Sequence, residues 1–157
     1  MENTTIIKNN IMYSGSYQII AELQIINERF ENLNISGSKL ENNHFENVHF
    51  VNCHFQGTAI IKTIFIDCTF ENCTFYSARL EGCNFVACKF DDCSFYITNS
   101  LTCNFLSCTL LNNDWKACSM NGCFHLCFIH DEERAQMNIT ADTDFLPLSS
   151  QLEVCVA

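Results

Sequence analysis

The chain has 157 residues, of which 48% are hydrophobic, and a formal net charge of −10. This length predicts one domain, and an acidic chain without a basic stripe is not expected to bind nucleic acid directly. No apolar run is long enough to span a membrane, and residues 1–10 lack the basic and apolar regions of a secretory signal. We therefore expect a cytoplasmic protein, with secretion as an effector left open.

Residues 16–27, SYQIIAELQIIN, form the first apolar segment. Its pattern fits either a short helix that begins after Ser14 or Ser16, or an extended strand, and the periodicity does not decide between them. We assign residues 1–27 to an N-terminal cap that covers the end of the structure that follows.

Residues 28–123 carry a repeat of five residues. Every phenylalanine in this stretch falls at a number divisible by five, and every cysteine falls two residues before such a position. The phenylalanines are Phe30, Phe45, Phe50, Phe55, Phe65, Phe70, Phe75, Phe85, Phe90, Phe95 and Phe105. A period of five matches neither the helical period of 3.6 nor the strand period of two. The backbone must therefore turn at a regular interval.

A second period of twenty is visible when every fourth repeat is compared. Phe45, Phe65, Phe85 and Phe105 form one column, whereas Leu40, Ile60, Leu80, Ser100 and Met120 form a column without an aromatic residue. Four repeats therefore make one turn, and like side chains stack on like about 4.8 Å apart, the spacing of neighbouring strands.

The stretch CTFENCTFYSARLEGCNFVACKFDDCSF resembles the pentapeptide-repeat proteins. This resemblance implies an all-β fold, a right-handed quadrilateral β-helix, here a solenoid of about five coils with capping segments at both ends. The large side chains point inward and the small residue fills the corner beside them. This chain is a cysteine-rich variant, with Ala78 as the one alanine at the small position. Known members are often bacterial and differ widely in function, so the resemblance predicts the fold more firmly than the activity.

The twelve cysteines are expected to be structural. Ten lie at the small inward position, where a free thiol acts as a compact hydrophobic group, and a reducing cytoplasm suits them. The spacing Cys123-x-His125-x-Cys127-x-x-His130 is not a common zinc frame, and three histidines spaced by five would point from three different faces. We expect no metal, no cofactor and no disulfide.

Residues 124–157 are assigned to a C-terminal cap and acidic tail. We expect a short helix to begin at Asp131, with Glu132 and Glu133 in its first turn. The following segment, with Pro147 and alternating apolar residues, is interpreted as an extended tail.

No catalytic motif is present: the sequence lacks a Ser-His-Asp set, a phosphate-binding glycine loop and a pair of catalytic carboxylates. We therefore expect a non-enzymatic scaffold that binds a protein partner through a flat face of the β-helix. Two alternatives come from the resemblance. Some pentapeptide-repeat proteins mimic DNA and inhibit or protect a type II topoisomerase (gyrase), and others are bacterial effectors delivered to host cells.

Two surfaces are candidates for these roles. The acidic row, Glu31, Glu71, Asp91 and Asp92, is the best match to a DNA-like charge pattern, but Val51 and Leu111 interrupt it. A stripe of apolar residues lies outward on the face centred on Phe85, and such a stripe usually marks a contact. This apolar stripe consists of Ile64, Ile66, Val86 and Leu106. The alternatives for what covers it are the protein's own tail, a partner, or a second copy in a homodimer. The tail residues available are Phe145, Leu146, Leu148, Leu152 and Val154.

Overall fold

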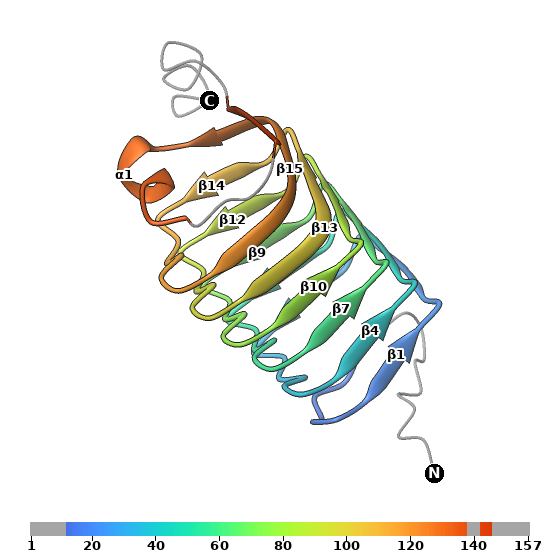
Figure 1. Ribbon diagram of the computed structural model, residues 1–157. Helices are drawn as coiled ribbons and strands as arrows, with labels where there is room; N and C mark the ends of the chain where they lie inside the picture. Colours follow the sequence, from blue (N-terminus) through green and yellow to red (C-terminus); the bar gives the residue numbers. More distant parts are fainter. Residues whose placement is uncertain (1–11, 138–141, 146–157) are drawn as a thin grey trace.

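The computed structural model describes residues 12–137 and 142–145. The chain winds as a four-sided parallel β-helix of about six turns (Figure 1). The predicted right-handed quadrilateral solenoid is confirmed. Each face is named below by its central residue in the coil that runs from Leu80 to Phe95.

Three faces are parallel sheets of three-residue strands, and consecutive strands of a face are twenty residues apart in register. The Leu80 face consists of β1 (Ile19–Ala21), β4 (Lys39–Glu41), β7 (Ala59–Ile61) and β10 (Arg79–Glu81). The Phe85 face consists of β2 (Gln24–Ile26), β5 (His44–Glu46), β8 (Ile64–Ile66) and β11 (Asn84–Val86). The Phe90 face consists of β3 (Arg29–Glu31), β6 (His49–Val51), β9 (Thr69–Glu71), β12 (Lys89–Asp91) and β14 (Thr109–Leu111).

The fourth face, the Phe95 face, is held by single bridges that join Asn34, His54, Thr74, Ser94 and Asp114. Two longer strands turn a corner of the coil. The strand β13 (Asn99–Leu106) continues both the Leu80 and the Phe85 face, and β15 (Ser119–Ile129) continues the Leu80, Phe85 and Phe90 faces (Figure 1).

The core is a set of stacked rings. Phe70 and Phe90 stack with their ring centroids 4.7 Å apart and their planes 2° from parallel, and Phe65 stacks on Phe85 at 4.9 Å. Within one coil the rings meet edge to face, as Phe85 and Phe90 do at 5.4 Å. Offset stacks and edge-to-face contacts are the favourable arrangements of aromatic pairs. The five-residue spacing therefore builds a continuous aromatic core.

The corners explain the many asparagines. The second residue after each central position has a left-handed backbone, for example Asn72 at φ 50° and Gly57 at φ 67°. Asparagine and glycine adopt this conformation at lower cost than other residues. Seven corner positions are asparagine: Asn27, Asn32, Asn42, Asn47, Asn52, Asn72 and Asn112.

The regular coils extend on both sides of the predicted stretch 28–123. On the N-terminal side, residues 16–27 form β1 and β2 rather than a helix, and Ile20 and Ile25 occupy the central buried positions of a first coil. The alternative of an extended strand is therefore the correct one.

On the C-terminal side the repeat shifts by one residue instead of ending at Cys123. A β-bulge between Ser100 and Cys103 pairs Cys103 with Gly122, so that Phe124 stacks on Phe105 at 4.5 Å. Gly122 has φ 154°, and a Cβ atom there would lie 1.9 Å from the carbonyl oxygen of Cys103. Only glycine allows this close approach of the two strands.

The C-terminal end of the coils carries the short helix α1 (Asp131–Arg134), which begins where the sequence predicted it. The strand β16 (Asp142–Phe145) then pairs with β15. The ring of Phe145 lies 5.7 Å from Phe124 and beneath the guanidinium of Arg134, so it packs on the last coil. In the described part of the chain, no helix has the length and apolar composition needed to cross a membrane.

Candidate interaction surface

The apolar stripe lies on the Phe85 face. Strand pairing places Ile66, Val86 and Leu106 directly above one another, because Ile66 pairs with Val86 and Val86 pairs with Leu106. Ile64 is 37% exposed and Leu106 is 38% exposed, whereas Ile66 and Val86 are half-buried. The four side chains sit on parallel strands and form one flat apolar strip.

A hollow of about 400 Å³ opens beside Val86 and Leu106, at the C-terminal end of the apolar stripe. Val86 and Leu106 form its apolar lining, and Asn84, Asn104 and His125 supply polar groups at its rim. The hollow combines an apolar floor with a few hydrogen-bonding groups, a composition that suits a protruding side chain of a partner. Sequence reasoning identified the stripe but not this hollow or the place of His125 beside it, because the one-residue shift at Gly122 moves His125 into register with Leu106.

Within the described residues, no part of the C-terminal tail covers the apolar stripe. Of the proposed tail residues, Phe145 packs on Phe124 at the end of the coils. Leu146, Leu148, Leu152 and Val154 lie outside the described residues.

The four acids of the acidic row do not all lie on one face of the β-helix. Glu31, Val51, Glu71, Asp91 and Leu111 stack in register on the Phe90 face. Arg29 lies 2.8 Å from Glu31, and Lys89 lies 3.7 Å from Asp91. Asp92 instead occupies the next corner. A DNA phosphate backbone carries a negative charge about every 3.4 Å along a strand. The acidic row does not reproduce this spacing, because two of its positions are apolar and two of its acids have a cation beside them.

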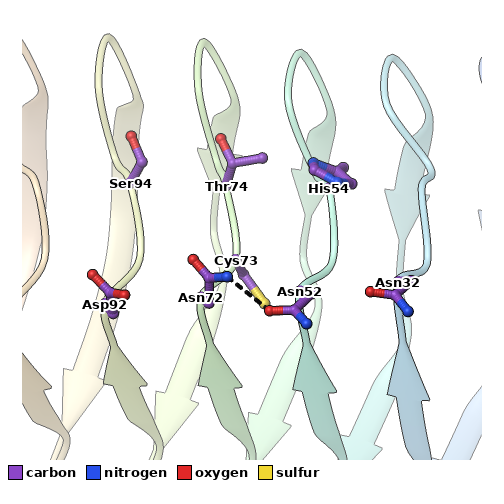
Figure 2. A pocket seen from close by; sticks show the side chains of 8 residues that line it. All are labelled: Asn32, Asn52, His54, Asn72, Cys73, Thr74, Asp92 and Ser94. Atoms are coloured by element: carbon purple, nitrogen blue, oxygen red, sulfur yellow. Dashed lines mark hydrogen bonds between the residues drawn. The ribbon is translucent and has the colours of Figure 1, made fainter.

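Asp92 belongs to a polar groove of about 360 Å³ between the Phe90 and Phe95 faces. Figure 2 shows its two rows: Asn32, Asn52, Asn72 and Asp92 follow one another along the corner, opposite His54, Thr74 and Ser94. The amide of Asn72 donates a hydrogen bond to Oδ1 of Asn52 at 2.7 Å. Amide ladders of this kind satisfy the corner side chains along the stack, so we interpret the groove as structural.

Comparison with solved structures assigns the fold to a known group. QnrB1, full length, described as a plasmid-mediated fluoroquinolone resistance protein, matches with 14% identity over 91% of this chain and 100% of its own, with a TM-score of 0.53. HetL, a pentapeptide repeat protein involved in heterocyst differentiation regulation from the cyanobacterium Nostoc sp. strain PCC 7120, matches with 11% identity over 79% of this chain and 70% of its own, with a TM-score of 0.38. The chain therefore has the β-helix fold of the pentapeptide-repeat proteins.

One further solved structure and two sequence comparisons complete the picture. Rfr23, a pentapeptide repeat protein from the cyanobacterium Cyanothece 51142, is 11% identical over 82% of this chain and 88% of its own, with a TM-score of 0.30. The family model that matches residues 1–95 places this stretch in the family described as the SV2A/B/C luminal domain. No curated protein matches the chain significantly. At 14% identity, the match to QnrB1 establishes the fold of the chain and not its partner.

Nine of the ten repeat cysteines lie buried where the repeat predicts, whereas Cys123 pairs with Asn104 and has left the small inward position. All the cysteines in the described residues are free thiols, and all but Cys123 are buried. Most of the ladder thiols donate to a carbonyl of the preceding coil, as Cys88 does to Phe65 at 3.3 Å. Burial, reinforced by hydrogen bonds with Cys108 and Cys68, raises the pKa of the Cys88 thiol far above its usual value. Cys88 is therefore a poor nucleophile at neutral pH.

The cluster around Cys123 does not converge on one point. Cys123 is half-buried and His125 is exposed on the outer side of β15, whereas Cys127 is fully buried and donates to the carbonyl of Phe105 at 3.2 Å. Cys127, rather than Cys123, continues the ladder after Cys108, because the repeat has shifted by one residue. No group of three or more potential metal ligands is assembled within the described ranges.

Sequence reasoning missed an aromatic patch on the Phe95 face. Tyr76 and Tyr96 stack 5.5 Å apart and are both exposed. Below them, Gly37 and Gly57 open a hollow of about 390 Å³ beside Tyr17. The spacing of twenty between Tyr76 and Tyr96 is the signal that could have revealed this patch.

Proposed function

We propose that this protein is a non-enzymatic interaction scaffold that binds a protein partner through the Phe85 face. The apolar stripe, with its adjoining hollow, is the observation that carries the proposal. Exposed apolar side chains arranged in register on a rigid sheet gain free energy when a partner removes them from water. The coil holds the strip flat before binding, so little conformational entropy is lost on association.

The outward columns of the other faces are less apolar than that of the Phe85 face, which supports the Phe85 face as the docking surface. On the Leu80 face, acidic and apolar residues alternate along the column Glu41, Ile61, Glu81 and Leu101, and Lys39 lies 3.0 Å from Glu41. On the Phe90 face, the apolar residues Val51 and Leu111 are separated by acids. Only the Phe85 face, among the described residues, places three apolar side chains consecutively in one outward column.

The test is capture of binding partners from native lysate with tagged protein, in which a Val86→Asp/Leu106→Asp variant is compared with the wild type. The control is Leu101→Asp, which puts one carboxylate on the neighbouring face of the coil that contains Leu106, at a residue that is 53% exposed. We expect the stripe variant to lose a partner that the wild type and the control both capture, with circular dichroism unchanged in all three. Equal capture by all three proteins would rule out the Phe85 face as the docking surface.

A second candidate is the DNA-mimic inhibitor or protector of a type II topoisomerase, and the likeness to QnrB1 is the observation that favours it. The discontinuous acidic row weighs against it, because Arg29 and Lys89 lie beside two of its acids. We therefore rank the DNA-mimic function below the scaffold function. A gyrase supercoiling assay, described in the Discussion, separates the two.

A further inference from the structure

We propose that the hollow at the corner between the Phe95 and Leu80 faces, called here the corner hollow, binds a neutral sugar ring of an oligosaccharide. The corner hollow has a volume of about 390 Å³ and is shaped by Tyr17, Gly37, Gln56, Gly57, Tyr76 and Ser77. This volume falls within the roughly 300–1,000 Å³ of small-molecule sites. The inference goes beyond the proposed function, because the corner hollow shares no residue with the apolar stripe.

Two successive glycines open the corner hollow. Gly37 and Gly57 both have the left-handed backbone of the corners, with φ 73° and 67°. Asparagine, aspartate, lysine and serine hold the same conformation at other corners, so the backbone alone does not require glycine in two neighbouring coils. Apart from its neighbours in the chain, the nearest atom to a Cβ built at Gly57 is the backbone nitrogen of Gly37, at 3.9 Å. The space over Gly57 is therefore open because a side chain is missing.

Aromatic rings form two walls of the corner hollow. Tyr76 stacks on Tyr96 with the ring centroids 5.5 Å apart and the planes 23° from parallel. Because these two residues are one coil apart along the rod, the second face of Tyr76 is turned towards the coil of Gln56 and the hollow. On the other side the ring of Tyr17 covers Gly37, with Cε1 lying 2.6 Å from the position that a Cβ atom would take. Tyr17 is 73% exposed and Tyr76 is 43% exposed, so both rings can contact a ligand.

The polar groups of the corner hollow carry no charge at neutral pH. Every lining residue is a serine, tyrosine, glycine or glutamine, although the chain has a net charge of −10. The hydroxyl of Ser36 donates to Oδ1 of Asn34 at 2.6 Å and is already engaged. The side chains of Gln56, Tyr76 and Ser77 make no hydrogen bond within the described residues. Hydroxyl and amide groups both donate and accept hydrogen bonds, so these three side chains can serve a ligand in either sense.

The combination of an aromatic face with neutral hydroxyl and amide groups suits a sugar. The face of an aromatic ring carries partial negative charge, so it attracts the C–H groups on the flat side of a sugar ring. The hydroxyls of the sugar both donate and accept, as do the side chains of Gln56 and Ser77.

Two other ligand classes match the corner hollow less well. A nucleotide or another phosphate-bearing ligand would find no cation in the lining, whereas arginine and lysine are the usual partners of phosphate. A polyproline segment is the common ligand of aromatic grooves. Its prolines have carbonyl acceptors but no N–H donors, so the acceptors of Gln56 and Ser77 would stay unmatched. A sugar uses both kinds of group.

Saturation-transfer NMR of the full chain with maltohexaose, cellohexaose and N-acetylchitohexaose tests the inference. Because Tyr17 and Tyr76 form an open site, we expect a dissociation constant on the order of 1 mM for at least one of the three sugars. Absence of saturation transfer to all three sugars would overturn the inference.

Filling the corner hollow should block the sugar without harming the fold. Gly57→Asn places a side chain in the open space, and seven other corners already hold asparagine in the same backbone conformation. We expect this variant to weaken sugar binding about tenfold or more. The matched control is Gly82→Asn, the same substitution at φ 62° on the corner between the Leu80 and Phe85 faces. The control should bind like the wild type, and an equal loss in both variants would contradict the site.

Substitutions of Tyr76 test the stacking contact. Tyr76→Ala removes the aromatic face and should weaken binding about tenfold or more, whereas Tyr76→Phe keeps the face and should stay within about threefold of the wild type. Tyr13→Ala is the control, because Tyr13 is 51% exposed and does not line the hollow. Unchanged binding by Tyr76→Ala, with native circular dichroism, would show that the sugar does not stack there.

A decaproline peptide tests the other occupant of an aromatic groove. If this peptide binds in a manner that depends on Tyr76 and none of the three sugars does, the sugar site is wrong. The stripe variant Val86→Asp/Leu106→Asp should bind the sugar like the wild type, because the apolar stripe lies on another face. Loss of sugar binding in that variant, with native circular dichroism, would contradict the corner hollow, whatever the outcome of the capture experiment.

Discussion

The carboxylate of Glu133 accepts a hydrogen bond from the indole Nε1 of Trp115 at 2.7 Å, and the same oxygen accepts one from Nδ2 of Asn113 at 2.8 Å. Trp115 is the last ring of the Phe95 column and is fully buried, with its ring stacked 4.2 Å from Phe95. A buried indole needs an acceptor for its N–H group. The helix α1 supplies that acceptor and so closes the open end of the column.

This contact predicts the effect of removing the carboxylate. Glu133→Ala leaves the N–H group of Trp115 and the amide of Asn113 without their acceptor, so we expect it to lower the free energy of unfolding by about 1–3 kcal/mol. Glu132→Ala, one residue earlier and exposed, should stay within about 0.5 kcal/mol of the wild type. Urea denaturation followed by tryptophan fluorescence measures both, and equal stability of the two variants would contradict the role of Glu133 as a cap.

The ring stack predicts where stability is concentrated. Phe70→Ala removes a fully buried ring that stacks on Phe50 and Phe90, so it should cost about 3–5 kcal/mol. Glu71→Ala changes the next, outward residue and should change stability by no more than about 0.5 kcal/mol. Chemical denaturation compares the two, and similar losses would show that the inward and outward assignment is wrong.

Gly122 predicts a steric effect at the shifted coil. Gly122→Ala would place a Cβ atom 1.9 Å from the carbonyl oxygen of Cys103, so the strands must separate and the stack of Phe124 on Phe105 must loosen. We expect a loss of more than about 2 kcal/mol, the scale of other substitutions that strain a packed backbone. The control is Gly82→Ala, where φ is also positive but the nearest atom lies 3.6 Å away. That substitution should cost about 1 kcal/mol, and an equal loss in thermal unfolding would dismiss the close-approach argument.

The thiol ladders predict low reactivity in the folded protein. All the described cysteines except Cys123 are buried and so are inaccessible to a reagent, and burial also raises the pKa of Cys88. Ellman's reagent should therefore modify few groups in the native protein and all twelve cysteines after denaturation. Stoichiometric disulfides, or most thiols reacting rapidly in the native state, would contradict the structural role of the ladders.

The acidic row predicts the outcome of a supercoiling assay. Purified protein should neither inhibit nor protect DNA gyrase at micromolar concentration, because cations accompany Glu31 and Asp91 and the row is interrupted at Val51. Dose-dependent inhibition that is relieved by Glu71→Lys and Asp91→Lys would instead favour the DNA-mimic function over the scaffold.

The sequence by itself determined the β-helix and the direction of nearly every side chain in its coils. A strict spacing of five, with a second period of twenty, allows one arrangement in which Phe65, Phe85 and Phe105 stack inside while Ile66, Val86 and Leu106 stack outside. The physical reason is that each coil contacts only its neighbours at the same register, so local periodicity defines the contacts.

Only the tertiary structure decided what happens where the period fails. The segment 16–27 becomes strands because the coil that follows offers Ile20 and Ile25 a register to join. Gly122 lets the last coil lose one residue, which places Cys127 in the thiol ladder and His125 at the end of the apolar stripe. The carboxylate of Glu133 accepts a hydrogen bond from Trp115, which lies eighteen residues earlier in the sequence. Such contacts depend on how the ends of the rod are closed in space, and no repeat in the sequence encodes them.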